Sequence, residues 1–119
     1  MAISVVQDVT VQFNNNGFIN LDCSGWETMV VQLESPTGTV YFNHTNDSGA
    51  VTGVTEGSPA LSTGYQPVQG VNLANGATLD STAATGLYRF QYIGRFLQLT
   101  NNAGSATASK VLVEFSKIY

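Results

Sequence analysis

Apolar residues alternate with polar ones along most of this chain, and this period of two is the feature that most restricts its fold. Ile3 and Val5, and then Val9, Val11 and Phe13, occupy alternate positions. Successive side chains of a strand point to opposite faces, so the spacing predicts strands with one face turned inward and one outward. Further runs of this kind cover residues 18–22, 26–34, 39–44, 50–55, 66–73, 87–92, 95–100 and 107–118. The sequence therefore predicts about nine strands.

Short clusters of Gly, Asn, Asp, Ser and Pro separate these runs. Such residues tolerate positive φ or close Asx turns, which favours tight connections between strands. The clusters lie at residues 15–17, 24–25, 35–38, 46–49, 75–76 and 101–104. We expect successive hairpins, of which residues 35–38 form the clearest. Residues 101–106 join the last two strands in the same way, and Gly94 turns between the two aromatic-rich strands of residues 86–100.

The fold class follows from these strands and turns. No window of eleven residues has a good helical period, and only a short helical turn is expected, near residues 81–85. A chain of 119 residues is one domain by length, so residues 1–119 form a single unit. We predict an all-β, antiparallel two-sheet β-sandwich, either jelly-roll or immunoglobulin-like.

One irregular segment, residues 56–69, is rich in Gly, Ser and Pro. It is expected to form a long loop or an edge strand over one end of the sandwich. Loops of this length in compact domains often carry interactions. Tyr65, which lies in this segment, is therefore a candidate interface residue.

Composition excludes several classes of function. Only 10% of residues are charged, against roughly 25% in an average domain, so the surface is polar but sparsely charged and suits packing against neighbours. The net charge is −4 with four Lys and Arg, which leaves no basic stripe for nucleic acid. No apolar run is long enough for a membrane span, and the N-terminus lacks a signal-peptide pattern, so we expect synthesis in the cytoplasm. Cys23 is the only cysteine and is expected to be either a small buried hydrophobe or a residue without a particular role.

Catalytic and metal-binding patterns are weak. His44 is the only histidine, no metal ligands surround it at a suitable spacing, and no serine lies in a nucleophile elbow. The eight acidic residues are scattered, which disfavours a glycosidase. The Asn-Asp-Ser-Gly sequence at residues 46–49 lacks the further acidic ligands of a calcium loop and is expected to be a turn. We therefore expect a chain that is not an enzyme and holds no cofactor or metal.

Aromatic residues suggest either a core or a sugar-binding platform. Tyr88, Phe90 and Tyr92 share one face of their strand, while Leu87, Arg89 and Gln91 share the other. A row of rings at period two is typical of a core, and stacking of rings against sugars is the alternative. Trp26, Tyr41, Phe42 and Phe96 complete the aromatic set on which a carbohydrate site would depend.

The two arginines and the C-terminus are the candidate contact residues. Arg89 and Arg95 are half of the cationic side chains and lie among rings, where arginine often anchors an interface. An intramolecular pair with a carboxylate such as Glu114 is the alternative. Strand-like residues continue to Ile118 and Tyr119, which suggests that this end docks either in its own sheet or on a neighbouring subunit.

Several short motifs resemble the small β-sandwich proteins of tailed bacteriophage virions. They are Trp26 before a strand, Thr39-Val40-Tyr41-Phe42 leading to residues 46–49, Gly86-Leu87-Tyr88, Gly94-Arg95-Phe96-Leu97 and Gly104-Ser105. The Asn-Asp-Ser-Gly sequence departs from the commoner Asn-Asp-Gly, and residues 56–69 have no clear counterpart.

The resemblance implies a non-enzymatic virion protein that decorates or cements the capsid by bridging neighbouring capsomers. Its partners would be the major capsid protein or other virion proteins, and further copies of itself, as a trimer. The alternative is a tail, baseplate or head-fibre adhesin domain that binds a carbohydrate of the host surface.

Overall fold

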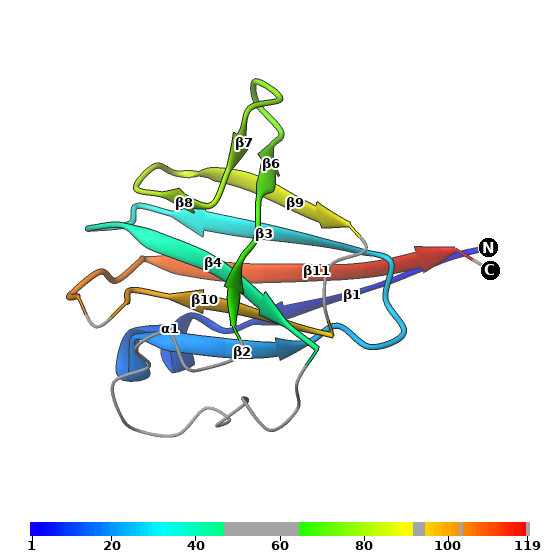
Figure 1. The fold of residues 1–119 in the computed structure, drawn as a ribbon, viewed down its shortest axis with the longest axis horizontal. Helices are drawn as coiled ribbons and strands as arrows, with labels where there is room; N and C mark the ends of the chain where they lie inside the picture. The colour runs from blue at the N-terminus through cyan, green and yellow to red at the C-terminus, as the bar shows by residue number, and fades with distance from the viewer. Residues whose placement is uncertain (47–64, 92–94, 103, 119) are drawn as a thin grey trace.

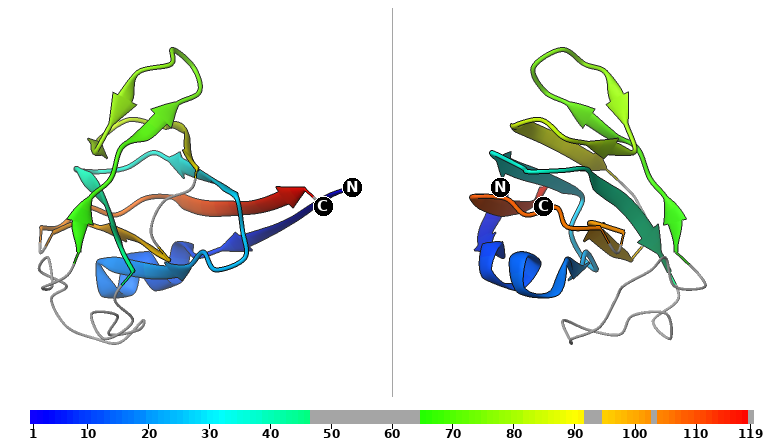
Figure 2. Two further views of the ribbon diagram at one scale, coloured as in Figure 1. Left: turned by 45° about the vertical axis from the view of Figure 1, so that its right-hand side comes forward. Right: turned by 90° about the vertical axis from the view of Figure 1, so that its left-hand side faces the viewer.

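Two antiparallel sheets pack face to face in the computed structural model, which describes residues 1–46, 65–91, 95–102 and 104–118 (Figure 1 and Figure 2). The side chains between the sheets form one hydrophobic core that includes Met29, Val31, Leu33, Val113 and Phe115. The predicted all-β, two-sheet sandwich is confirmed.

One sheet has six strands and the other five. The six-stranded sheet has the order β1 (Ala2–Asp8), β11 (Lys110–Ile118), β3 (Thr28–Glu34), β9 (Gly86–Gln91), β6 (Gly70–Asn72) and β7 (Thr78–Leu79). The five-stranded sheet has the order β2 (Phe18–Asp22), β10 (Phe96–Thr100), β4 (Val40–Thr45) and β5 (Gln66–Pro67), and β8 (Ser81–Thr82) also pairs with β4.

The strand order is that of a jelly roll. If β1, β2, β3, β4, β5, β9, β10 and β11 are counted as the eight main strands, one sheet has the order 1-8-3-6 and the other 2-7-4-5. The chain thus passes repeatedly from one sheet to the other, as in a double Greek key. Of the two sandwiches expected, the structure adopts the jelly roll.

Three connections predicted as hairpins instead cross between the sheets. Residues 35–39 join β3 to β4, residues 92–95 join β9 to β10, and residues 101–109 join β10 to β11, and each pair of strands belongs to different sheets. Turn residues report only that the backbone reverses, whereas burial of the two strand faces decides which sheet receives the next strand. The hairpin at Asn75 and Gly76, between β6 and β7, lies within one sheet, and Gly76 has φ +75°.

The predicted strand at residues 66–73 is also divided between the two sheets. Gln66 and Pro67 form β5 in the five-stranded sheet, and Gly70 begins β6 in the six-stranded sheet. Residues 81–85, where a helical turn was expected, instead begin with strand β8. The strand predicted at residues 50–55 lies outside the described residues.

The prediction of a strand through Phe13 is wrong, because Thr10–Asn16 form a helix, α1. Val9 and Phe13 are four residues apart and are both buried, while Val11 between them is exposed, as expected for one face of a helix. Gly17 ends the helix with φ +80°, and its N–H donates to the carbonyl of Phe13. The helix lies beside β2 and β11 and closes one edge of the sandwich (Figure 2).

The aromatic row of β9 belongs to the core. Tyr88 and Phe90 are fully buried, and the ring of Phe42 from the opposite sheet contacts both, with centroids 5.6 and 5.0 Å apart. Tyr92 lies outside the described residues. Cys23 is buried, which was one of the two expectations for it.

Figure 1 shows that β1 and the end of β11 project from the body as a ribbon that carries both termini. Ala2 pairs with Ile118 at its tip. The C-terminal strand therefore docks in its own sheet, which was one of the two expected outcomes.

Candidate functional site

The outer faces of the two sheets differ in burial. On the five-stranded sheet, Phe18, Asn43, Gln98 and Thr100 point away from the core and are nevertheless buried. On the six-stranded sheet the outward residues of β1, β3, β9 and β11 are exposed or half-buried. The outer face of the six-stranded sheet is therefore the broad strand surface open to a partner.

One row of side chains crosses the centre of this open face. The strand register places Val6 beside Glu114, Glu114 beside Val30, Val30 beside Arg89, and Arg89 beside Val71. Neighbouring strands lie about 4.8 Å apart, so the row spans about 19 Å. A cation and a carboxylate thus occupy equivalent positions on either side of Val30.

The side chain of Arg89 contains an unsatisfied polar atom. Its Nε atom is buried and has no hydrogen-bond partner among the described residues. A buried donor without an acceptor costs free energy, which a rotation of the guanidinium toward a partner's carboxylate would recover. The sequence indicated Arg89 as a contact residue, and the structure places it at the middle of the open face.

Apolar side chains extend the row along the strands. Leu112, Gln32 and Leu87 form the next row, and the side chain of Leu87 is 42% exposed. A hollow of about 170 Å³ adjoins Leu87 and is lined by residues 32–34 and 85–87. Sequence analysis missed the contribution of Leu112 and Gln32, because their place beside Leu87 depends on the strand order.

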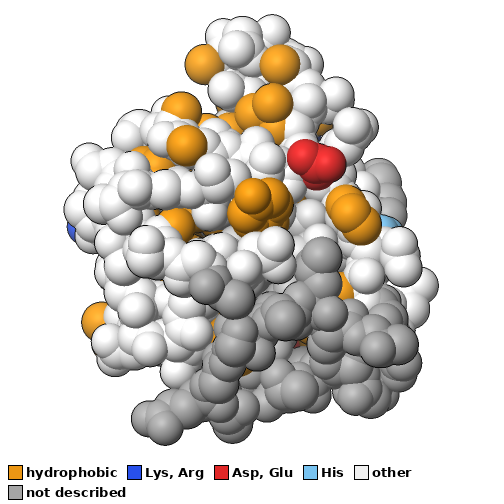
Figure 3. Space-filling model, turned by 60° about the vertical axis from the view of Figure 1, so that its left-hand side comes forward, with side chains coloured by type: hydrophobic (Ala, Val, Ile, Leu, Met, Phe, Trp, Pro, Cys, Tyr) orange, Lys and Arg blue, Asp and Glu red, His pale blue; other side chains and the backbone are white. Residues whose placement is uncertain are grey.

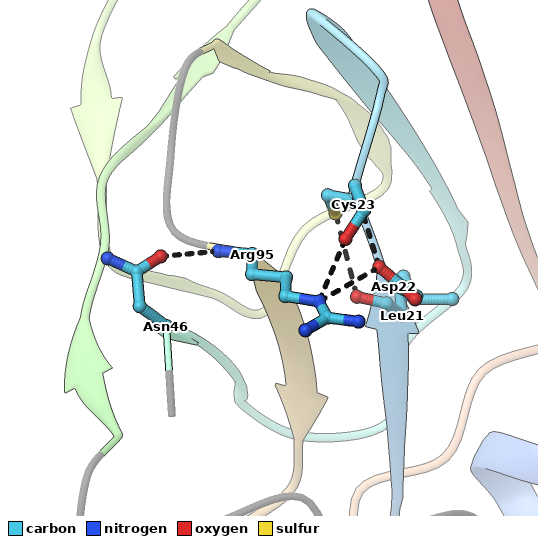
Figure 4. Close-up of polar contacts among 6 residues, drawn as sticks. Leu21, Asp22, Cys23, Asn46 and Arg95 are labelled. Atoms are coloured by element: carbon cyan, nitrogen blue, oxygen red, sulfur yellow. Dashed lines mark hydrogen bonds and ion pairs between the residues drawn. The ribbon is translucent and has the colours of Figure 1, made fainter. Parts of the chain in front are cut away.

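Arg95 lies on a different part of the molecule, before β10, and is half-exposed (Figure 4). Its Nε donates to Ser24 Oγ at 2.9 Å and lies 3.9 Å from Asp22 Oδ1. The guanidinium also lies 5.0 Å from the centre of the Phe96 ring. The intramolecular carboxylate of Arg95 is therefore Asp22 and not Glu114, because β2 is the strand that pairs with β10.

Local hydrogen bonds fix the carboxylate of Asp22 and the backbone of Arg95. The side-chain and backbone hydrogen bonds from Ser24, with a smaller contribution from Arg95, lower the pKa of Asp22. The backbone N–H of Arg95 donates to Asn46 Oδ1 at 2.8 Å, and its carbonyl accepts from the N–H of Cys23. The guanidinium is therefore presented from a fixed backbone.

Tyr65 lies inside the molecule, which corrects its expected role on a contact surface. The residue is 5% exposed, and its hydroxyl donates to Asn20 Oδ1 at 2.7 Å. Gln98 Nε2 donates to the same oxygen, and Asn43 Nδ2 donates to Gln98 Oε1. The phenol completes a row of amides across β2, β10 and β4.

A second surface surrounds Tyr41 on β4, whose side chain is partly exposed. A hollow of about 240 Å³ beside it is lined by Asn43, Pro67, Asp80 and Asn102. Another of about 250 Å³ lies beside Tyr41 and is lined also by residues 38–39, 101 and 104–106. An aromatic ring flanked by amides and a carboxylate suits a polar, ring-shaped ligand. Figure 3 shows a face with scattered hydrophobic side chains and little charge.

The structure describes one of the two C-terminal candidate contact residues. Ile118 is 75% exposed at the tip of the ribbon, and Tyr119 lies outside the described residues. Lys117 Nζ lies 5.2 Å from the centre of the Trp26 ring, which in turn packs against Phe115. The N–H of Ile118 also donates to Glu27 Oε1 at 2.6 Å. The ribbon is thus held close to its tip, where the side chain of Ile118 is exposed.

The residues that the structure describes include no cluster of metal ligands and no helix that could cross a membrane. In that part of the chain no group of three His, Cys, Asp or Glu side chains is arranged to hold a metal ion. His44 shares the inward face of β4 with Val40 and Phe42. Within the same residues, no helix has the length and hydropathy needed to cross a bilayer.

Comparisons with known proteins give one match, at the level of fold. No protein-family model matches the sequence, and no curated protein matches it significantly. The structure is similar to the crystal structure of the SPBc2 prophage-derived protein YomS, with a TM-score of 0.59 over 98% of this chain and 93% of that one. The sequences are 12% identical, so the similarity shows a common fold.

Proposed function

We propose that this chain is a non-enzymatic bacteriophage virion protein that decorates or cements the capsid by bridging neighbouring capsomers. The observation that carries the proposal is the end-to-end similarity of fold to a prophage-derived protein, which covers 98% of the chain. The motifs around Trp26, Tyr41 and Arg95, which resemble those of virion proteins, support it independently, because they are features of the sequence and not of the fold comparison.

The mechanism follows from a rigid sandwich with few charges. Strands that bury one face on a shared core hold their outward side chains in fixed positions. A protein that binds only the assembled shell stabilises that shell by mass action, and many copies arranged by capsid symmetry need only weak individual contacts. We assign Arg95 and the Ile118 ribbon as contacts with the shell, because both are exposed and both start from a fixed backbone.

Particles of the phage that encodes this chain test the proposal. Particles lacking the protein should burst at a lower temperature and a milder osmotic shock, and added protein should restore resistance at high copy number. Arg95→Ala should weaken binding to the shell, while Lys110→Ala serves as a matched control on the open face of the other sheet. Full-strength particles without the protein would overturn the cementing role.

A carbohydrate-binding adhesin is the second candidate, and the surface around Tyr41 favours it. The hollow lined by Asn43, Asp80 and Asn102 provides polar groups beside an exposed ring. Binding to a glycan array that Tyr41→Ala abolishes would support an adhesin. Low copy number and a position at the tail would accompany that result.

A further inference from the structure

We infer that the open face of the six-stranded sheet is the binding surface for a second copy of this chain, in a two-fold pair held by Arg89 and Glu114. Two observations carry this inference. The Nε atom of Arg89 is buried and lacks an acceptor within the described residues. In the row through Arg89, a two-fold rotation about Val30 exchanges the positions of Arg89 and Glu114, so the row of one copy is complementary in charge to the same row of a second copy.

The two-fold relation can be derived from the register. An axis that runs between the two faces, parallel to the strands and over β3, brings β11 of one copy opposite β9 of the other. It also brings β1 opposite β6. Sheets that pack face to face keep their strands within about 30° of one another, which this arrangement satisfies. A pair built in this way is closed, because each copy offers the same surface.

Charges meet their opposites across this axis. Arg89 of each copy faces Glu114 of the other, because both residues lie one strand away from Val30 in the same row. The contact therefore occurs twice. The ion pair seen between side chains of the described residues joins Arg95 to Asp22 and involves neither Arg89 nor Glu114.

Apolar and polar groups also match. Val6 faces Val71 at the two ends of the central row. Leu112 faces Leu87, and the hollow of about 170 Å³ beside Leu87 can receive its side chain. In the row on the other side, Ser116 faces Gln91, so polar side chains meet there.

One like-charge contact lies at the margin. Glu34, at the end of β3, is close to the axis and approaches Glu34 of the second copy. Lys110 is its register partner on β11, and Gln32 Nε2 donates to its carboxylate. Solvent and salt screen charges at the rim of an interface, so the two central pairs dominate.

A second copy suits this face better than a three-fold arrangement of the kind expected from the resemblance. A row with opposite charges at equal distances from its centre is self-complementary about a two-fold axis. A three-fold contact would join two different surfaces and would not use this symmetry. The inference stands apart from the proposed function, since it concerns the purified chain without a virion.

Charge reversal tests the inference by sedimentation velocity on the full chain. Wild type should show a concentration-dependent dimer. Arg89→Glu and Glu114→Arg should each be monomeric at the same concentrations, with the apparent Kd raised at least about tenfold by two like-charge contacts. Arg95→Glu changes the charge equally on the other side of the sandwich and should leave the dimer intact.

Mixing the variants gives the decisive result. When an Arg89→Glu chain pairs with a Glu114→Arg chain, one of the two contacts has its charges exchanged and the other is the wild-type contact. Both contacts are then attractive, so a 1:1 mixture should form a heterodimer. The double variant should dimerise alone. Circular dichroism checks each fold, and Glu114→Arg is sufficient by itself if Arg89→Glu does not fold, because Glu114 is exposed. A monomeric or trimeric wild type, a dimer that survives Glu114→Arg, or a monomeric mixture of folded variants would overturn the inference.

Discussion

The hydroxyl of Tyr65 donates a hydrogen bond of 2.7 Å to Asn20 Oδ1, and this bond connects the strand at one edge of the five-stranded sheet with the residue that precedes β5 at the other. Gln98 lies between them and donates to the same oxygen. The residue expected to bind a partner therefore stabilises its own sheet. Buried amides that satisfy one another in this way hold three strands in a single register.

Removing this hydroxyl should destabilise the fold modestly. Tyr65→Phe keeps the ring but loses the bond, while Asn20 Oδ1 retains Gln98 as a donor. We expect the free energy of unfolding to fall by about 1 kcal/mol in urea titrations. Tyr41→Phe, at a partly exposed tyrosine, is the matched control and should change stability by less than half as much. Equal effects of the two substitutions would contradict the role assigned to Tyr65.

Alkaline pH should weaken the fold through Cys23. Burial raises the pKa of its thiol from 9.0 to about 11. The unfolded chain loses this proton first, so the stability contributed by Cys23 is complete below pH 9 and is lost as pH rises through 11, on the order of 2 kcal/mol in total. Urea titrations at several pH values should show a shallower decline for Cys23→Ala than for wild type. Parallel curves would refute this assignment.

Burial also raises the pKa of Tyr65, to about 12. The stability that Tyr65 contributes should therefore also fall as pH rises, over a higher pH range than for Cys23. It is complete below the unfolded value of 10 and declines as pH rises towards 12. Above pH 9, the free energy of unfolding of the double variant Cys23→Ala, Tyr65→Phe should therefore fall less steeply with pH than that of wild type or of either single variant. An unchanged slope in that variant would assign the decline to other groups.

A side chain at Gly70 should strain the core. A Cβ placed there would lie 2.6 Å from Phe90 Cζ, and the ring is held by Phe42 in the opposite sheet. We expect Gly70→Ala to cost about 1–3 kcal/mol, measured by thermal or urea unfolding. In a Phe90→Leu background the same change should cost less, because a smaller side chain relieves the contact. Additive costs would show that the ring is not the obstacle.

Arg95 should contribute little to the stability of the isolated chain. Its side chain is 51% exposed and the ion pair with Asp22 measures 3.9 Å, so Arg95→Ala should change the free energy of unfolding by less than about 1 kcal/mol. Asp22→Ala should cost more, because it also removes the acceptor for the N–H of Ser24. A larger loss for Arg95→Ala than for Asp22→Ala would show that the guanidinium serves the fold.

The loss of folding stability at acid pH should depend on Asp22. Hydrogen bonds from Ser24 lower its pKa in the folded state, so its contribution is present above the unfolded pKa of 3.8 and is lost as pH falls through the lower folded value. Ser24→Ala removes the side-chain bond and should shift the loss to higher pH, as followed by NMR titration of the carboxylate. An unchanged titration would leave the lowered pKa without this cause.

Much of the fold could be read from local patterns. The alternation of Met29, Val31 and Leu33 with Val30 and Gln32, and of Tyr88 and Phe90 with Arg89, was enough to assign inward and outward faces. The period of side chains within a strand is a property of its backbone and needs no knowledge of neighbours. The helix at Thr10–Asn16 was missed because Val9, Val11 and Phe13 also satisfy a period of two over a short run.

The amino-acid sequence by itself determined that this chain forms strands with one buried face, has a polar and sparsely charged exterior, and places Arg89 on the strand face opposite Tyr88 and Phe90. Only the tertiary structure decided that three apparent hairpins cross between sheets and that Val30 separates Arg89 from Glu114. It also placed Tyr65 inside the molecule. The reason is that a side chain's direction depends on its immediate backbone, whereas strand neighbours are chosen by the burial gained over the whole sandwich against the entropy of closing long loops.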